Sequence, residues 1–191
     1  MFYIVGLGNP GEEYENTRHN TGALAVENFA KKSDFPAWNT DKKLSALVTE
    51  SKVSKLILPQ TFMNKSGNSL KLLITSKKKA ENLIVIYDDL DMPLGKLKIS
   101  FGRGSGGHKG VESIVRAIKT KDFIRIRVGI APATPSGKIK KPKGEKKIVD
   151  FILGNFSKKE TETLKKVSGK VSEALEVIIK EGRAKAMNKF N

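Results

Sequence analysis

The first 22 residues join a short apolar run to a segment rich in glycine and asparagine, and this limits the folds open to the chain. Phe2 to Val5 is apolar and carries β-branched residues, as expected of a buried strand. The next segment, Gly6 to Gly22, reads GLGNPGEEYENTRHNTG and opens with residues that end a regular element. Asn9, Tyr14 and His19 thus follow the carboxyl end of a strand. Ligands bind at that edge of open α/β sheets, so we expect the active site here.

Strand and helix patterns alternate along the rest of the chain. Apolar spacing predicts helices that end near Lys32 and that cover 70–74, 111–118, 148–153 and, after a Ser157 cap, 164–179. Strand patterns cover 44–49 and 53–58, which could pair as a hairpin, and also 83–87, 96–101 and 123–130. Residues 35–43 read as a loop and 131–147 as a mobile basic loop. This order predicts a single α/β domain over 1–191, with a mixed, mostly parallel central sheet flanked by helices.

Polar residues follow three of the predicted strands. Asn9 follows the first strand, and Asn64 comes soon after Leu56 to Pro59. Asp88 follows Leu83 to Tyr87, a strand that we expect the sequence DDLDMP to break. We therefore expect Asn9, Asn64 and Asp88 to converge on one edge of the sheet.

His19 is one of two histidines in the chain, and histidine is well suited to move protons near neutral pH. A lone loop histidine is more often structural or exposed, so its partner matters. A carboxylate at Asp88 could fix the tautomer and stabilise the imidazolium that forms when the other ring nitrogen takes a proton. The chain has no serine nucleophile of the GxSxG type. These features predict water as the nucleophile and His19 as its general base.

Two other kinds of site fit less well. Gly6, Gly8 and Gly11 match the GxGxxG pattern of dinucleotide-binding folds, but no helical apolar stripe follows until Leu24. The acids in DDLD could bind Mg²⁺ or Ca²⁺. Because no second cluster supplies further oxygen ligands, we predict no metal site.

Several residues near this edge leave two interpretations open. The amides of Asn9 and Asn64 could bind a substrate carbonyl or only cap turns. Gly104 to Gly110 could bind an anion at a helix start or serve as a flexible connector. Tyr14 and Phe62 could stack on a base or only line a pocket.

The charge of the chain is uneven. The net charge is +16, yet residues 1–50 hold five Lys or Arg against seven Asp or Glu. The basic excess therefore lies in the remaining residues, where it favours a polyanionic partner. A lysine-rich composition that only keeps the protein in solution is the alternative.

The sequence also indicates the cellular compartment of the protein. The chain has no cysteine, no apolar run of the roughly 20 residues that cross a bilayer, and no secretion signal in its first residues. We expect a cytoplasmic protein without a membrane partner.

Four motifs in order make the pattern specific: GLGNPGxxYxxTRHNxG, TFMNxSG, DDLDMPxG and GxGGHxG. In sequence and spacing they closely resemble bacterial-type peptidyl-tRNA hydrolase, and the similarity extends to the FILGNF stretch before the last helix. The resemblance implies a single α/β domain that hydrolyses the ester between a peptide and the 3′ end of tRNA, without metal or cofactor.

The resemblance also implies roles for individual residues. His19 would activate water, Asp88 would hold His19 in its basic form, and Asn9 would help to distinguish blocked from free aminoacyl groups. Tyr14, Phe62 and Asn64 would contact the tRNA 3′ end or the adjoining peptide.

The glycine-rich motif carries the one departure from the family pattern. Lys109 stands where the family has an asparagine, and lysine cannot accept a hydrogen bond. We place Lys109 and the preceding His108 among the residues that contact tRNA.

The partner implied by this resemblance is peptidyl-tRNA, bound through its 3′ end and acceptor stem by a monomer. The basic excess would then serve tRNA phosphates, especially through 138–147 and the final helix. A non-catalytic RNA-binding relative of the same fold is the alternative. Hydrolysis of another small ester or amide is a third possibility, but it leaves the charge unexplained.

Overall fold

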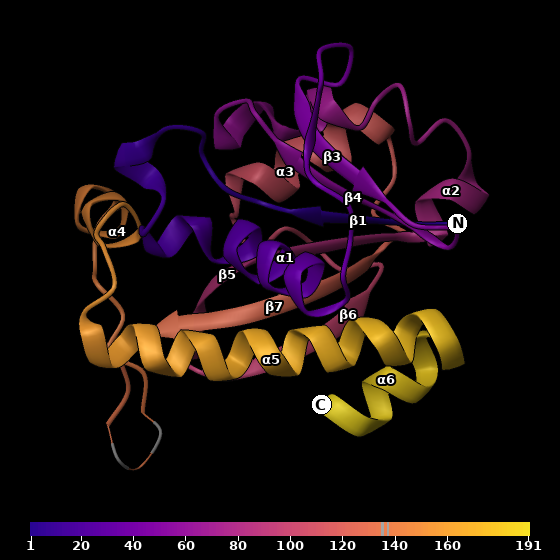
Figure 1. Ribbon diagram of the computed structural model, residues 1–191. Helices are drawn as coiled ribbons and strands as arrows, with labels where there is room; N and C mark the ends of the chain where they lie inside the picture. The colour runs from indigo at the N-terminus through magenta and orange to yellow at the C-terminus, as the bar shows by residue number, and fades with distance from the viewer. Residues whose placement is uncertain (135, 137) are drawn as a thin grey trace.

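A seven-stranded sheet forms the centre of the molecule, with the strand order β2-β3-β4-β1-β5-β7-β6 (Figure 1). The computed structural model describes residues 1–134, 136 and 138–191. The strands are β1 Phe2–Gly6, β2 Asn39–Asp41, β3 Ala46–Glu50, β4 Ser54–Pro59, β5 Leu83–Pro93, β6 Leu97–Phe101 and β7 Ile124–Ala131. The α-helices are α1 Thr21–Lys32, α2 Lys77–Glu81, α3 Lys109–Ile118, α4 Glu145–Ile152, α5 Lys158–Glu181 and α6 Arg183–Phe190. Short 3₁₀ helices are η1 Glu12–Tyr14, η2 Arg18–Asn20 and η3 Met63–Ser69.

The four central strands, β4, β1, β5 and β7, run parallel to one another. Antiparallel strands complete both sides, β3 and β2 next to β4, and β6 next to β7. Ile4 and Val5 of β1 and Ile84 and Val85 of β5 are fully buried on both faces of the sheet. Such continuous apolar strands are typical of a parallel sheet covered by helices. The predicted α/β class and mixed sheet are confirmed.

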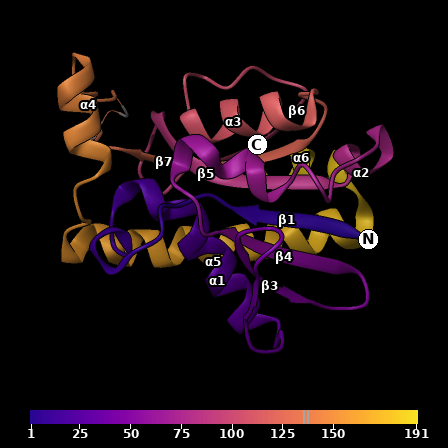
Figure 2. The same cartoon turned by 90° about the horizontal axis from the view of Figure 1, so that it is seen from above.

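Two apolar layers enclose the sheet. On one face α1, α5 and α6 pack through residues such as Phe29, Val171 and Ala186. On the other face α3 and η3 contribute Val111, Ile114 and Met63. Figures 1 and 2 place α4 at one end of the molecule and α2 at the opposite end, beside the N-terminus. The carboxyl ends of the parallel strands thus point toward the end that carries α4.

Most predicted elements are present, including the β3–β4 hairpin and the α5 helix capped by Ser157. Ser157 and Glu160 form a capping box, in which each side chain bonds the other residue's backbone N–H. A separate helix, α6, follows Gly182, whose φ of 88° suits glycine.

The helix predicted over 70–74 is absent. The segment follows η3 and forms a single turn, in which Leu73 N and Ile74 N both bond to Leu70 O. The preceding η3 turn packs closely against α3. A Cβ on Gly67 would lie 2.2 Å from Ser113 O of α3, so this backbone packs directly against α3.

The predicted break at DDLDMP is also wrong, because β5 continues to Pro93. It pairs with β7 as far as Asp89 and Gly129, and after an irregularity Pro93 pairs with Ala131. The strand can contain these two buried carboxylates because each has a partner: His19 contacts Asp88, and Arg127 bonds Asp89.

Two loop predictions need smaller corrections. The segment 35–43 contains the short edge strand β2. The basic loop after β7 ends at Gly144, because α4 already begins at Glu145. Within this loop Lys140 N bonds Pro132 O, whereas Pro135, also assigned to the loop, lies outside the described residues.

Among the described residues, no helix combines the length and the apolar character that crossing a membrane requires.

Candidate active site

The structure brings His19 and Asp88 together at the carboxyl edge of the sheet. Nδ1 of His19 lies 2.9 Å from Oδ1 and 3.1 Å from Oδ2 of Asp88. His19 comes from η2, immediately before α1, and Asp88 comes from β5. Both side chains are buried, so water competes little for their hydrogen bond.

Close packing at the start of α1 explains how His19 reaches Asp88. A Cβ on Gly22 would lie 2.2 Å from Ile86 O and 2.7 Å from Leu7 N. Only glycine allows the first turn of α1 to approach β1 and β5 so closely. The backbone bond from Ala23 N to Leu7 O, at 3.0 Å, fixes the same contact. Since His19 lies only three residues before Gly22, this contact places its ring over the end of β5.

His108 is the second histidine on the same carboxylate. Its Nε2 lies 3.0 Å from Asp88 Oδ1, the oxygen that His19 also contacts. Its Nδ1 accepts a hydrogen bond from Val111 N, so His108 caps the N-terminus of α3. A ring nitrogen that accepts a bond carries no proton, and the proton therefore sits on Nε2 and is donated to Asp88.

The loop before His108 depends on glycine. Gly102, Gly106 and Gly107 have φ angles of 66°, 64° and 81°, which other residues rarely adopt. This conformation turns the chain back from β6 and delivers His108 to Asp88. The sequence placed His108 among the tRNA contacts, whereas the structure joins it to the His19–Asp88 pair. The signal that could have revealed this role is that the chain has only two histidines.

The shared carboxylate sets the protonation of the cluster. Burial by itself raises the pKa of Asp88, but its contacts with His19 and His108 hold that pKa well below its usual range. Burial alone lowers the pKa of His19, yet the charge and hydrogen bond of Asp88 outweigh it and raise this pKa above its ordinary value. Asp88 is therefore ionised near neutral pH. Its bond to Nδ1–H of neutral His19 leaves the lone pair of Nε2 available as a base.

Asn9 joins the loop after β1 to the loop after β4. Its Oδ1 accepts a hydrogen bond from Met63 N at 2.8 Å. Tyr14 and Phe62 also meet across these two loops, with ring centroids 6.5 Å apart and planes nearly perpendicular. Phe62 is 56% exposed, and Asn64 is exposed as well. The loops after β1 and β4 thus form one surface that carries aromatic and amide side chains.

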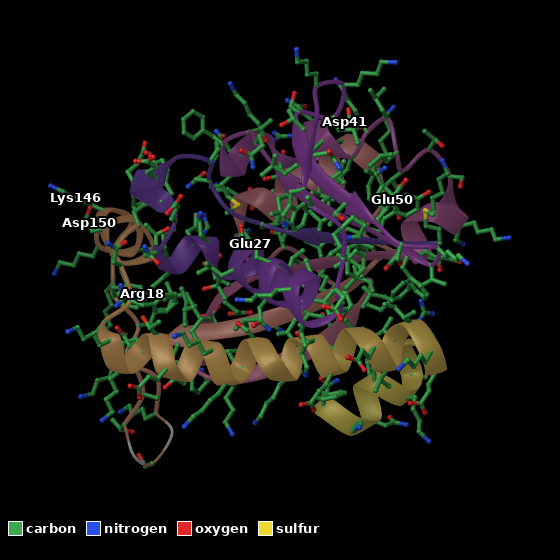
Figure 3. The ribbon with its side chains drawn as sticks, viewed as in Figure 1. Arg18, Glu27, Asp41, Glu50, Lys146 and Asp150 are labelled. Atoms are coloured by element: carbon green, nitrogen blue, oxygen red, sulfur yellow. The ribbon has the colours of Figure 1, made fainter. Side chains whose placement is uncertain are left out.

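Arg18, which the sequence analysis did not single out, anchors the helix pair that borders the site. Its guanidinium bonds both carboxylate oxygens of Glu160 at 3.1 and 3.2 Å, and also bonds Gly154 O at 3.1 Å. The ring of Phe151 lies over the guanidinium at 4.4 Å. In Figure 3, Arg18 lies at the same end of the molecule as Lys146 and Asp150 of α4. The FILGNF stretch therefore docks against the residue next to His19.

A cleft of about 1030 Å³ opens beside the cluster. His19 and Asp88 lie in its wall together with the glycine-rich loop. The apolar residues Ile148, Val149 and Ile152 of α4 line it as well. Because α4 has no buried residue, its apolar face is left for whatever occupies the cleft.

His19, Asp88 and His108 are also the one group of potential metal ligands among the described residues, with ligand atoms within 4.8 Å of one another. The donor set does not suit a metal ion. Nε2 of His108 carries the proton, and moving that proton to Nδ1 would set it against the N–H of Val111. The acids further along β5 are paired, Asp89 with Arg127 and Asp91 with Lys141.

Lys109 lies at the start of α3 and is largely exposed. Its Nζ is 3.6 Å from Glu112, an exposed pair of the kind that contributes little stability. The side chain is therefore free to reach another anion.

The fold and these contacts define an α/β protein with a buried histidine–aspartate pair at the carboxyl edge of its sheet. A sequence model of the family described as peptidyl-tRNA hydrolase matches residues 3–191. The peptidyl-tRNA hydrolase of Thermodesulfovibrio yellowstonii is 43% identical over 199 residues, which cover 100% of this chain and 99% of that relative. The one from Herpetosiphon aurantiacus is 40% identical, with 100% and 90% covered.

Solved structures of peptidyl-tRNA hydrolases have a similar fold. The crystal structure of peptidyl-tRNA hydrolase from Acinetobacter baumannii is similar with a TM-score of 0.87 and 30% identity, covering 100% of this chain and 94% of that one. This chain belongs to the peptidyl-tRNA hydrolase family, and the resemblance read from its motifs is confirmed.

Replacing Asp88 by asparagine tests the electrostatics of the pair. The amide cannot stabilise the imidazolium, so we expect kcat to fall by about 10²- to 10⁴-fold, the usual worth of general-base assistance. Without the carboxylate, burial lowers the pKa of His19, so the acidic limb of kcat/KM should move to lower pH. A pH–rate profile whose acidic limb stays in place would contradict this account.

Proposed function

We propose that this chain hydrolyses the ester bond between a peptide, or an N-blocked aminoacyl group, and the 3′ end of tRNA, releasing free tRNA. The observation that carries the proposal is the His19–Asp88 pair, with Nε2 of His19 left as a base beside a cleft, in a chain of this family. The intact pair gives no support to a non-catalytic RNA-binding relative.

In the proposed reaction, Nε2 of His19 takes a proton from water as the water oxygen attacks the ester carbonyl. Asp88 stabilises the imidazolium through Nδ1–H, and His108 donates a second hydrogen bond to Oδ1 of the same carboxylate. The tetrahedral intermediate then expels the 3′ oxygen of tRNA, which regains a proton from His19. The products are a peptide acid and a tRNA hydroxyl, and no step requires a metal or another cofactor.

The neighbouring residues receive roles in binding. Since Oδ1 of Asn9 is bonded to Met63 N, its Nδ2 is the group left to donate to a peptide carbonyl. That preference would favour N-blocked substrates. Tyr14, Phe62 and Asn64 contact the tRNA 3′ end or the adjoining peptide, and the rings of Tyr14 and Phe62 pack edge to face.

Residues 1–191 act as one domain and as a monomer in the cytoplasm. The partner is the 3′ end and acceptor stem of peptidyl-tRNA, attracted by the net charge of +16.

The direct test is single-turnover hydrolysis of N-acetylaminoacyl-tRNA by the parent protein and by His19→Ala. The parent should release tRNA and strongly prefer the acetylated substrate over free aminoacyl-tRNA. His19→Ala should be slower by about 10²- to 10⁴-fold and, because it removes a buried hydrogen-bond partner of Asp88, less stable to thermal unfolding than the parent. Equal turnover by the two proteins would refute His19 as the base, and a parent without activity would refute the proposed function.

Lys109 should act as a cationic contact for a tRNA phosphate, in place of the neutral amide of the family pattern. Lys109→Asn should keep kcat at saturating substrate, because the His19–Asp88 pair is untouched. It should weaken tRNA binding and lower the log–log salt slope by about one unit, the effect of one lost phosphate contact.

A matched control for this variant is Lys78→Asn. Lys78 is an exposed residue of α2, at the end of the molecule opposite α4, and its replacement should leave the salt slope unchanged. If Lys109→Asn also leaves the slope and the affinity unchanged, Lys109 makes no ionic contact with tRNA.

A further inference from the structure

Asn20, the residue after His19, does not perform the role that its position predicts. It is the N-cap residue of α1, and asparagine there usually accepts a hydrogen bond from the first turn of the helix. Its side chain makes no such capping bond. The side chain is nevertheless buried, with 6% of the residue exposed. A buried amide that does not cap its helix must satisfy its hydrogen bonds elsewhere.

The amide of Asn20 is bonded instead to the backbone of Asn9, eleven residues earlier. Asn20 Oδ1 accepts from Asn9 N at 2.8 Å, and Asn20 Nδ2 donates to Asn9 O at 2.9 Å. The two bonds hold the backbone of one residue from both its donor and its acceptor. A Cβ on Gly8 would lie 3.0 Å from Asn20 Cγ, so the neighbouring glycine keeps room for this contact.

These bonds determine what Asn9 can offer a ligand. Its backbone N–H and C=O are both taken by Asn20, and its Oδ1 is taken by Met63 N. Within the part of the chain that the structure describes, Nδ2 of Asn9 has no hydrogen-bond partner. A fixed backbone and a fixed Oδ1 leave the side-chain amide little freedom to rotate, so its two N–H groups are held in one direction.

We propose that Asn20 is a positioning residue that holds Asn9 so that its amide N–H groups meet the peptide carbonyl of an N-blocked substrate. Asn20 thereby sets the preference for blocked over free aminoacyl groups, an inference that rests on the proposed function. His19 and Asn20 are adjacent in the chain but have separate tasks: His19 acts on water, and Asn20 acts through Asn9.

The test is a double-mutant cycle on substrate selectivity. The quantity measured is kcat/KM for N-acetylaminoacyl-tRNA divided by kcat/KM for free aminoacyl-tRNA. Asn20→Ala should lower this ratio by about 3- to 10-fold, the worth of one neutral hydrogen bond. In an Asn9→Ala background, Asn20→Ala should change the ratio no further, because its route to the substrate is already gone.

Two further measurements separate positioning of Asn9 from other effects. The acidic limb of the pH–rate profile should stay in place in Asn20→Ala, since the His19–Asp88 pair is intact. Asn28→Ala is the matched control, because this asparagine of α1 bonds Ser172 of α5 and should leave the ratio unchanged. Should Asn20→Ala fail to fold, Asn20→Ser keeps a favourable N-cap residue but is too short to hold both groups of Asn9.

The outcomes are distinct. An unchanged ratio in Asn20→Ala, or an equal drop in the Asn9→Ala background, overturns the inference while leaving the proposed function in place. A shifted acidic limb would show that Asn20 acts through His19 and overturns the inference as well. A parent protein that hydrolyses blocked and free substrates equally well overturns the proposed selectivity and this inference together.

Discussion

The carboxylate of Asp88 joins three separate parts of the chain. It lies within the central strand β5 and receives hydrogen bonds from His19, just before α1, and from His108, just before α3. An unpaired charge this deeply buried would cost several kcal/mol, and the contacts with both histidines favour its ionised form. In return, the ionised carboxylate orients His19 and raises its pKa.

The surrounding contacts keep these parts in register. Gly22 lets α1 pack against β1 and β5, and this packing sets the position of His19 relative to Asp88 on β5. Arg18 joins the same turn to the α4–α5 junction through Glu160 and Gly154, so the apolar wall of the cleft is attached next to His19. Each segment that forms the site is therefore held by close buried packing or by a pair of hydrogen bonds.

The sequence predicted the parts of this arrangement that follow from strand order and side-chain chemistry. Asp88 lies on β5 just beyond the last residue paired with the parallel strand β1, so the His19–Asp88 contact was predictable. The contact of His108 with Asp88 was not, because it depends on how glycines with positive φ fold the preceding loop. The continuation of β5 through DDLDMP was missed for a related reason: local propensity disfavours Asp and Pro in strands, and the compensating Arg127 is distant in sequence.

The most direct test of this account is the tautomer and pKa of His19, measured by ¹⁵N NMR of the imidazole rings across a pH titration. We expect neutral His19 to carry its proton on Nδ1 and to titrate above the ordinary value of about 6.5, because Asp88 stabilises its charged form. Neutral His108 should carry its proton on Nε2. A His19 that titrates below the ordinary value, or that carries its neutral-form proton on Nε2, would contradict the account.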